Sequence, residues 1–398
     1  MGLRRRIPVG SRGGSTQTSV SPKRRWQRKP NQNGSPDGGI PEELSPKRLR
    51  RRLLEFGAVA AAVGLVVLVG PGLGGVRHRL GQASPGWVGV AVALEVLSAL
   101  SYVVTFRVVF CQRMRWRLGY QIGMAEQGAN SVLSVSGIGG LALGAWALRR
   151  GGLSTEHIAR RSVAFFFLTS FANVAGVIVF AALYAVGVLG GKHNDGLTYG
   201  FGAAALAATV LVLLLPVLLA RRTPTSAAPD GPSATDQTPR LATAMTFVRD
   251  SLGQGIRDAV RLLRDHPIMA LGSSVGIMAF DLAVLGVAYR SLHHSIPIGA
   301  LALGYLIGQL GGNLPVPAGI GGLDAGLIGV LVLYHQPLAV TAGAVLIYRT
   351  ISIWVPAILG SIAFIQLRRT LLQAPQPAMI CSPLADPTKI VGAHAEAG

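Results

Sequence analysis

The C-terminal third of the chain reads Asn313-Leu314-Pro315-Val316-Pro317-Ala318-Gly319-Ile320-Gly321-Gly322-Leu323-Asp324. This stretch decides the fold, because an earlier part of the chain repeats it. There, Asn130 precedes Gly137-Ile138-Gly139-Gly140-Leu141, and Gly144 follows as Gly326 does in the later copy. The shared pattern GIGGLxxG interrupts an apolar stretch in both places, about 121–148 and 298–334. One broken apolar segment that occurs twice is typical of membrane domains built from two related halves.

Glycine has a physical role at such a break. A helix interrupted inside a bilayer exposes backbone N–H and C=O groups that hydrocarbon cannot satisfy. Glycine permits the tight turn and close helix approach that bury them, and Pro315 and Pro317 favour an extended entry to the second turn. The half-helix that follows would direct N–H groups toward the bilayer centre, where a phosphate or carboxylate can bind. The alternative is that these glycines only pack helices closely.

Composition assigns the chain to a membrane. Half of its 398 residues are hydrophobic and only 14% are charged, whereas soluble domains carry about 25% charged residues. The formal charge is +20, but long apolar runs separate the basic blocks, so a soluble nucleic-acid binder is excluded. Two cysteines, Cys111 and Cys381, are too few for a disulfide framework or a zinc ligand set. We expect no cofactor, no metal and no nucleic-acid partner.

Six stretches are long enough to cross a bilayer, which takes about 20 apolar residues. They lie near 55–73, 86–106, 162–190, 198–220, 268–291 and 338–366. The predicted domains are a disordered basic cytoplasmic arm at 1–52, a transmembrane domain at 53–372 and a disordered tail at 373–398. Within the transmembrane domain, 221–265 is a cytoplasmic linker followed by an amphipathic helix. That helix either lies on an anionic membrane surface or packs on the protein's own cytoplasmic loops.

The basic residues predict the orientation of the spans. If residues 1–52 are cytoplasmic and each run crosses once, 32 of the 37 Lys and Arg residues lie on the cytoplasmic side. This asymmetry fits the positive-inside rule and predicts a multi-pass protein of the inner (plasma) membrane with both termini cytoplasmic. Stretch 121–148 then starts and ends in the cytoplasm, as a re-entrant hairpin would. Stretch 298–334 starts and ends outside, as two short spans or a second hairpin from the opposite face.

The predicted fold is therefore all-α: a polytopic helical membrane bundle with inverted repeats and two glycine-broken re-entrant hairpins. Charged groups inside it need a partner or water. They are Glu95, Glu126, Asp281, Asp324 and Arg349. Asp281 and Arg349 lie at similar depth, so they can pair, and Asp324 is the competing partner of Arg349. Such an ion pair either only fixes the packing of the helices or takes part in binding a substrate or a proton.

The C-terminal third resembles the lysylphosphatidylglycerol synthase transmembrane-region family, a flippase-like domain that also occurs as stand-alone actinobacterial proteins. The resemblance rests on Gly304-Tyr305-Leu306-Ile307-Gly308-Gln309, Asn313 to Asp324, Tyr348-Arg349, Trp354-Val355-Pro356 and Gly360, and on Asn130 to Gly151 followed by Arg160-Arg161-Ser162-Val163-Ala164-Phe165. It implies a helical domain that moves or handles anionic phospholipids or polyprenyl-linked lipids. Asp324 stands where the family more often has Glu, and Gly140-Leu141 and Phe165-Phe166-Phe167 replace acidic pairs of many members.

We therefore expect a flippase that binds anionic membrane lipids, with no catalytic or metal residues. The expected lipid-binding residues are Asn130, Gly137, Gly139, Gly140, Asn313, Pro317, Gly319, Gly321, Gly322, Asp324, Arg349 and Asp281. One alternative is a scaffold for a separate membrane or cytoplasmic glycosyltransferase or acyltransferase. Another is an intramembrane lipid-phosphate enzyme, whose usual motifs we do not find. Lipid aminoacylation is not expected, since the sequence ends about 30 residues after the last span. The sequence predicts neither which particular lipid is the substrate nor the oligomeric state.

Overall fold

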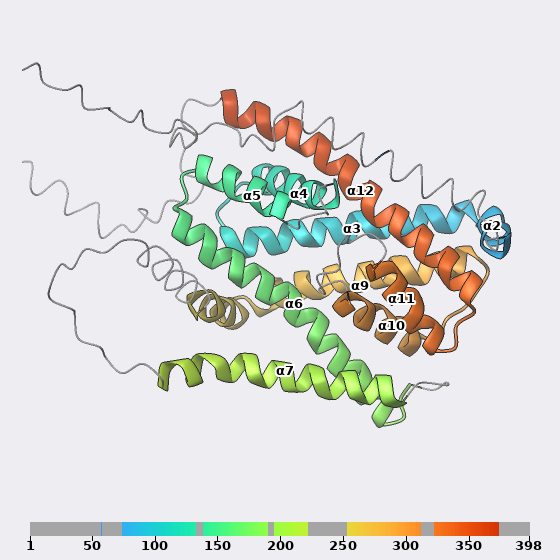
Figure 1. Cartoon of the computed structure of the whole chain (residues 1–398). Coiled ribbons are helices and arrows are strands. Elements are labelled where there is room, and N and C mark those ends of the chain that lie inside the picture. Colours follow the sequence, from blue (N-terminus) through green and yellow to red (C-terminus); the bar gives the residue numbers. More distant parts are fainter. Residues whose placement is uncertain are drawn as a thin grey trace, which may run out of the picture. The chain divides into compact units, whose positions relative to one another are not determined.

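The described part of the chain is helical throughout (Figure 1). The computed structural model describes residues 57, 74–132, 138–189, 195–221, 253–311 and 322–373, all within one compact unit that begins at Ile40. For these residues the predicted all-α bundle is confirmed. The predicted basic arm, nearly all of the first predicted span, the segment 222–252 and the predicted tail beyond Gln373 lie outside them.

Long apolar helices lie at the positions of five of the six predicted spans. They are α3 (Pro85–Phe110), α6 (Thr155–Ala185), α7 (Asp195–Arg221), α9 (Pro267–Ser291) and α12 (Leu338–Gln373), with the short α2 (Gly74–Gly81) before α3. Four of them, α3, α6, α9 and α12, are long and apolar enough to cross a membrane. Prolines begin α3 and α9, where a missing N–H is harmless, and the Ser154 hydroxyl caps α6 by accepting from the His157 N–H.

Two of the described helices begin within the two glycine motifs, and the residues before those helices, 133–137 and 312–321, lie outside the described part. The first break separates α4 (Trp116–Val132) from α5 (Ile138–Arg150), and the second separates α10 (Ile298–Gly311) from α11 (Gly322–Leu333). The partners pack on each other in both pairs. At 1.5 Å per residue α10 and α11 are about 21 and 18 Å long, short of a hydrocarbon core of about 30 Å. Their lengths favour a hairpin over two short spans.

The hairpins enter from opposite ends of the helical unit (Figure 1). The α4–α5 hairpin opens where α3 ends and α6 begins, whereas α10–α11 opens near α2. Helices α3 and α9 pack against each other and run antiparallel. The start of α3 lies at the end of α9, where the Ser84 N–H donates to the Ser291 carbonyl at 2.9 Å. Helix α12 packs on α4, and α6 packs on α10. Each long helix that follows one hairpin thus covers the first half-helix of the other, which is the arrangement of an inverted repeat.

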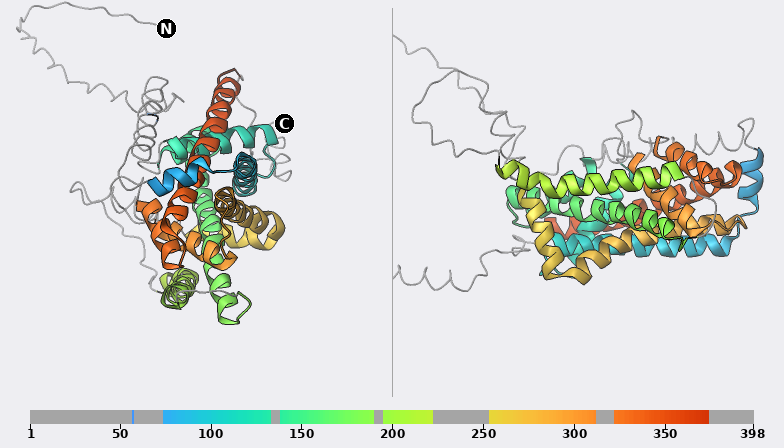
Figure 2. Two further views of the ribbon diagram at one scale, coloured as in Figure 1. Left: turned by 90° about the vertical axis from the view of Figure 1, so that its right-hand side faces the viewer. Right: turned by 90° about the horizontal axis from the view of Figure 1, so that it is seen from below.

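Two clusters of buried apolar side chains follow this arrangement. One contains α10–α11 residues such as Leu303 and Leu331, and the other contains α4–α5 residues such as Ile122 and Leu148. The long helices α3, α6, α9 and α12 contribute to both clusters, and Figure 2 shows them running roughly along a common direction. The long helices therefore join the hairpins.

Exposed apolar side chains form the outer surface along α12. Trp354, Ile358, Ile362 and Ile365 recur at helical spacing and are each 41–55% exposed. Such a stripe suits contact with lipid tails.

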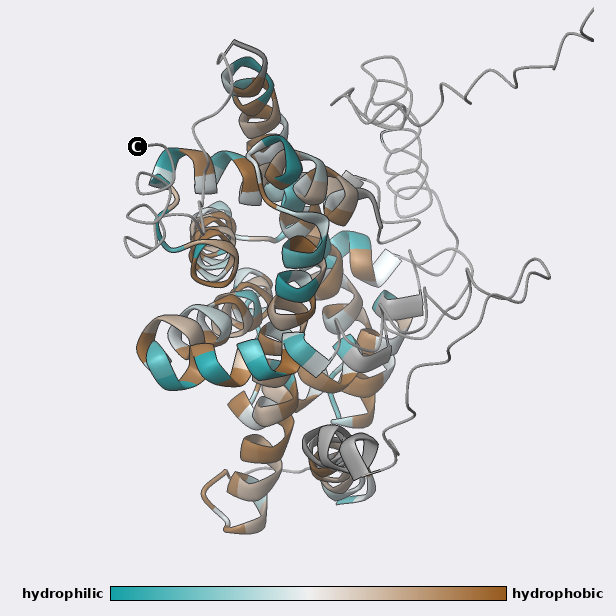
Figure 3. Cartoon of the chain, turned by 90° about the vertical axis from the view of Figure 1, so that its left-hand side faces the viewer, coloured by the Kyte–Doolittle hydropathy of each residue, from teal (hydrophilic) through white to brown (hydrophobic). Residues whose placement is uncertain are grey.

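Basic side chains gather at one end of the unit, which we call the basic end. Its arginines are Arg107, Arg113, Arg115, Arg117, Arg149, Arg150, Arg160, Arg161, Arg257, Arg261, Arg264, Arg368 and Arg369. Figure 3 looks onto this end, where hydrophilic turns stand out against hydrophobic helices. The opposite end, near α2, carries Arg77, Arg79 and Arg290 among the described residues. The asymmetry predicted from sequence therefore coincides with the two ends of the helices.

The helix at residues 253–265 packs on the protein itself. Asp258 lies 3.0 Å from the Arg160 guanidinium of α6, which also donates to Gln254 at 3.1 Å. Ala259 and Leu262 are buried in the cluster of the first hairpin. This part of the helix therefore packs on the basic end, and its Arg257, Arg261 and Arg264 are exposed. Contact of the helix with a membrane surface stays a prediction.

Helices α4 and α12 touch backbone to backbone. A side chain at Gly128 would meet the Gly360 Cα at 2.7 Å and the Pro356 carbonyl oxygen at 2.8 Å, and one at Gly360 would meet the Met124 carbonyl oxygen at 2.5 Å. Small residues allow this approach between membrane helices. The contact fixes the first hairpin to α12.

We predict that Gly360→Val separates α4 from α12 and lowers the free energy of unfolding by about 1–3 kcal/mol, as overpacking does. Thermal unfolding in detergent measures the change. Gly89→Val is the matched control, because nothing lies within 4 Å of a side chain at that α3 position. Equal stability of the two variants would contradict the close contact.

The orientation can be tested by cysteine labelling in a background where Cys111 and Cys381 are serine. We expect Gln112→Cys and Glu156→Cys, which flank the first hairpin at exposed positions, to react with an impermeant reagent only from the cytoplasm. Gly81→Cys, at the end of α2, should react only from outside. Labelling of Gln112→Cys and Glu156→Cys from different sides would show that α4 and α5 form one crossing.

Candidate functional site

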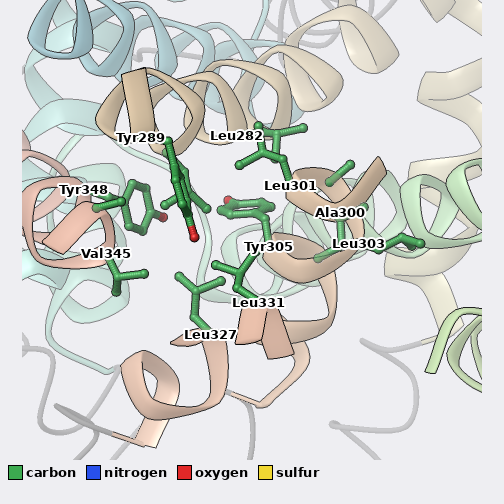
Figure 4. Close-up of a cluster of buried hydrophobic side chains, with 14 of the residues drawn as sticks. Leu282, Tyr289, Ala300, Leu301, Leu303, Tyr305, Leu327, Leu331, Val345 and Tyr348 are labelled. Atoms are coloured by element: carbon green, nitrogen blue, oxygen red, sulfur yellow. The ribbon is translucent and has the colours of Figure 1, made fainter. Parts of the chain in front are cut away.

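A polar cluster lies in the second half of the unit, surrounded by apolar side chains. At its centre the Asp281 carboxylate of α9 accepts hydrogen bonds from the Tyr305 hydroxyl of α10 and from the Tyr348 hydroxyl of α12, the latter at 2.9 Å. Both tyrosines are at most 3% exposed, and their rings meet edge to face with centroids 6.3 Å apart. Figure 4 shows them between Leu282, Leu327 and neighbouring side chains. Two donated hydrogen bonds stabilise the ionised form of this carboxylate.

Arg349 forms an ion pair with Asp324. Its guanidinium Nε donates to the Asp324 carboxylate in the first turn of α11, and its Cζ lies 5.9 Å from the centre of the Tyr348 ring. The two side chains are 24% and 29% exposed, so the pair is partly accessible. Asp324 is therefore the partner of Arg349, and Asp281 is bound by tyrosines instead. Asp281 still acts electrostatically on Arg349.

Glu95 adds a third carboxyl group from α3. It is 3% exposed, and its Oε2 has no hydrogen-bond partner among the described residues. It interacts electrostatically with Asp281 across the α3–α9 contact, and with Tyr348. The cluster thus combines three carboxyl groups with one guanidinium, and each of these four groups comes from a different helix.

The first hairpin contains a second polar site. The Asn130 side-chain oxygen of α4 accepts from the Gly140 N–H in the first turn of α5, at 3.1 Å. This bond satisfies one of the N–H groups that a helix start leaves free. One turn earlier Glu126 is 3% exposed, and a side chain at Gly144 would come within 2.3 Å of its Oε2. The Tyr102 phenol lies beside the same carboxyl group.

The two hairpins use glycine in opposite ways. In the first, Gly140 and Gly144 on the second half-helix make room for Asn130 and Glu126. In the second, Gly304 and Gly308 on the first half-helix make room for Leu331 and Leu327, with side chains there 2.3 and 2.9 Å from a leucine methyl group. The contact between α4 and α5 is consequently polar, and the contact between α10 and α11 is apolar. The polar groups of the second hairpin face α9 and α12 instead.

The structure brings three of the predicted lipid-binding residues together: Asp281, Asp324 and Arg349. Asn130 and Gly140 meet in the other hairpin, where Gly139 lies in the first turn of α5, and Gly322 begins α11. The remaining predicted residues, Gly137, Asn313, Pro317, Gly319 and Gly321, lie outside the described residues. Binding of lipid by any of them stays a prediction.

Sequence reasoning did not assign Tyr305 and Tyr348 to the site, although both stand in the stretches that carry the family resemblance. The signal was a tyrosine inside an apolar run, whose hydroxyl needs a partner once buried. Glu95 was noted only as an intramembrane acid. Within the described ranges no group of three or more His, Cys, Asp or Glu side chains could hold a metal ion.

Long apolar helices, two opposed half-helix hairpins and buried charges define the class: a multi-pass membrane protein. The family model described as lysylphosphatidylglycerol synthase TM region matches residues 55–360. The chain belongs to this family of membrane domains. Comparison with curated proteins and with solved structures gave no significant match.

A double-mutant cycle measures the Arg349–Asp324 pair. We expect Asp324→Asn and Arg349→Gln each to destabilise the protein, and the double variant to lose less than the sum, with a coupling free energy of about 1 kcal/mol or more. Chemical unfolding in detergent gives the three values. A matched cycle of Asp324→Asn with Arg290→Gln, at the exposed end of α9, should be additive. Additivity of the first cycle would refute the pair.

Proposed function

We propose that this protein moves anionic phospholipids or polyprenyl-linked lipids between the leaflets of the inner membrane, with Arg349 as the residue that binds the headgroup. The observation that carries the proposal is the position of Arg349. It lies 11 residues into α12, about 17 Å from the start of that helix, among charged and phenolic groups. Intramembrane charges are rare because they are energetically costly, and they commonly mark a substrate path.

The chemistry of the site supports an anionic ligand. A guanidinium binds phosphate with directed hydrogen bonds, and the partly exposed Asp324 is a carboxylate that a phosphate can replace. The start of α11 at Gly322 adds N–H groups near the same side chain. Membership of a lipid-handling family agrees with this choice of substrate class.

The inverted hairpins supply a means of transport. Each hairpin reaches inward from one end and is covered by a long helix of the other half. Tilting of one half against the other would open the polar cluster to one leaflet and then to the other, as in transporters with inverted repeats. We further propose that the basic end and both termini face the cytoplasm, in keeping with the positive-inside rule.

The test is a lipid-movement assay with purified protein in liposomes that contain fluorescent phosphatidylglycerol in both leaflets. We expect dithionite to quench the inner-leaflet dye at least about tenfold more slowly with Arg349→Gln than with the wild type, which corresponds to a loss of about 1.4 kcal/mol of stabilisation. Arg349→Lys should also be impaired at equal protein levels, because an ammonium group lacks the planar donor array.

Arg290→Gln is the control, since it removes an exposed arginine at the other end of the protein. Chemical turnover of the lipid would indicate an enzyme. No movement of phosphatidylglycerol or of a polyprenyl phosphate by the wild type would refute the flippase and favour the scaffold.

A further inference from the structure

The central cluster contains more acidic than basic side chains. Glu95, Asp281 and Asp324 are potential anions, and Arg349 is the cation beside Asp281 and Asp324. If all were ionised, the site would carry two net negative charges before any ligand arrived. A lipid phosphate would add another, in surroundings where like charges repel far more strongly than in water. An anionic headgroup can therefore bind well only if the site gains positive charge.

We propose that binding of the anionic headgroup at Arg349 is coupled to the uptake of one proton by the Glu95–Asp281 pair, so that lipid and proton cross together. This inference rests on the proposed function and names its driving force. The proton comes from water on the side where the headgroup enters, binds a carboxylate oxygen of the pair, and leaves to water on the other side with the headgroup.

The geometry divides the roles of the two carboxyl groups. Asp281 accepts two phenolic O–H donors, from Tyr305 and Tyr348, and both stabilise its anionic form. Glu95 is 3% exposed, and its Oε2 has no hydrogen-bond partner among the described residues. Of the two, only Glu95 has no described donor to stabilise its ionised form, so its protonation depends most on the neighbouring charges. Glu95 is therefore the member that takes the proton.

Arg349 links the proton to the headgroup. It interacts electrostatically with Asp281 and lies beside the ring of Tyr348, whose hydroxyl donates to Asp281. In the empty site Asp324 pairs with this cation. A phosphate that replaces Asp324 at Arg349 leaves the Asp324 carboxylate without its partner, so the site holds one more uncompensated negative charge. That charge favours protonation of the carboxyl pair.

The other helices around Glu95 bring no competing cation among the described residues. On α9 the facing group is Asp281, and on α12 the facing group is the Tyr348 hydroxyl. The acid of α4, Glu126, lies beside Tyr102, two turns along α3 from Glu95. The charged groups of α6 lie in its first turns at the basic end, and are Glu156, His157, Arg160 and Arg161.

The experiment repeats the liposome assay with fluorescent phosphatidylglycerol while the pH is varied equally on both sides. For the wild type, the rate should rise as the pH falls, by up to about tenfold per pH unit, which is the slope of a one-proton step. Glu95→Gln, which resembles the protonated carboxyl group, should move lipid at a rate that does not depend on pH. Glu95→Asp should restore the dependence.

Glu156→Gln is the control, because it neutralises an exposed glutamate in the first turn of α6, outside both polar sites, and should keep the wild-type slope. With a pH gradient across the vesicle, the wild type should accumulate dye in the leaflet on the alkaline side, and a protonophore should abolish the accumulation. Replacement of sodium by choline should change nothing.

Failures of the two proposals are distinguishable. Lipid movement that is equally fast at all pH values, or that follows sodium instead, refutes proton coupling and leaves the flippase intact. Absence of movement refutes both. If Glu95→Gln does not fold, proton uptake by the wild type decides: titration with phosphatidylglycerol in weakly buffered detergent should take up about one proton per lipid bound, and no uptake refutes the coupling.

Discussion

The central constraint on the structure is that helices too short to cross a membrane need hydrogen-bond partners for the backbone groups at their ends, and need other helices around them. The described half-helices have 12–17 residues, and backbone groups left free at a helix end inside a bilayer need partners within the protein. The Asn130–Gly140 hydrogen bond meets part of this need, and the glycine contact between α4 and α12 closes the hairpin against a long helix. Because the two halves are inverted, each hairpin is completed by the other half. Neither half would form this enclosed interior alone.

The same enclosure explains why polar groups gather where they do. Asp281, Arg349 and Glu95 lie near the middle of helices whose flanking residues are apolar, so each must find its partner inside the bundle. Tyrosines are suited to this task, since their rings pack with the apolar cluster while their hydroxyl groups donate to a carboxylate. A polar centre inside an apolar cluster is stable when its members bind one another, and it changes state when a ligand replaces one of them.

Much of this architecture follows from the sequence for simple reasons. Hydropathy locates α3, α6, α7, α9 and α12, because each helix must satisfy its own backbone in lipid. The repeated glycine motif locates both breaks, and the arginines mark the basic end. The partner of Arg349 was harder to predict, because depth alone allowed both Asp281 and Asp324. The choice depends on how α11 rotates against α12, which is fixed by packing between segments far apart in sequence.

Other features were hidden for a similar reason. Tyr305 and Tyr348 count as apolar in a hydropathy pattern, and only the fold shows that their hydroxyl groups meet at one carboxylate. The apolar face of the helix at 253–265 could be covered by a membrane surface or by the protein itself. The spacing of its apolar residues is the same in both cases, so the sequence pattern does not distinguish them. Only the fold shows that Asp258 contacts Arg160 of α6.

Helix α12 contains a proline at position 356, inside its 36 residues. Residues before it, such as Tyr348 and Ile351, belong to the cluster of the second hairpin, whereas Leu367 and Leu371 belong to that of the first. Proline cannot bond to the carbonyl four residues earlier, so the helix has a point of low bending stiffness between its two attachments. Pro356 thus places this point of lower stiffness between the part of α12 that packs on the second hairpin and the part that packs on the first.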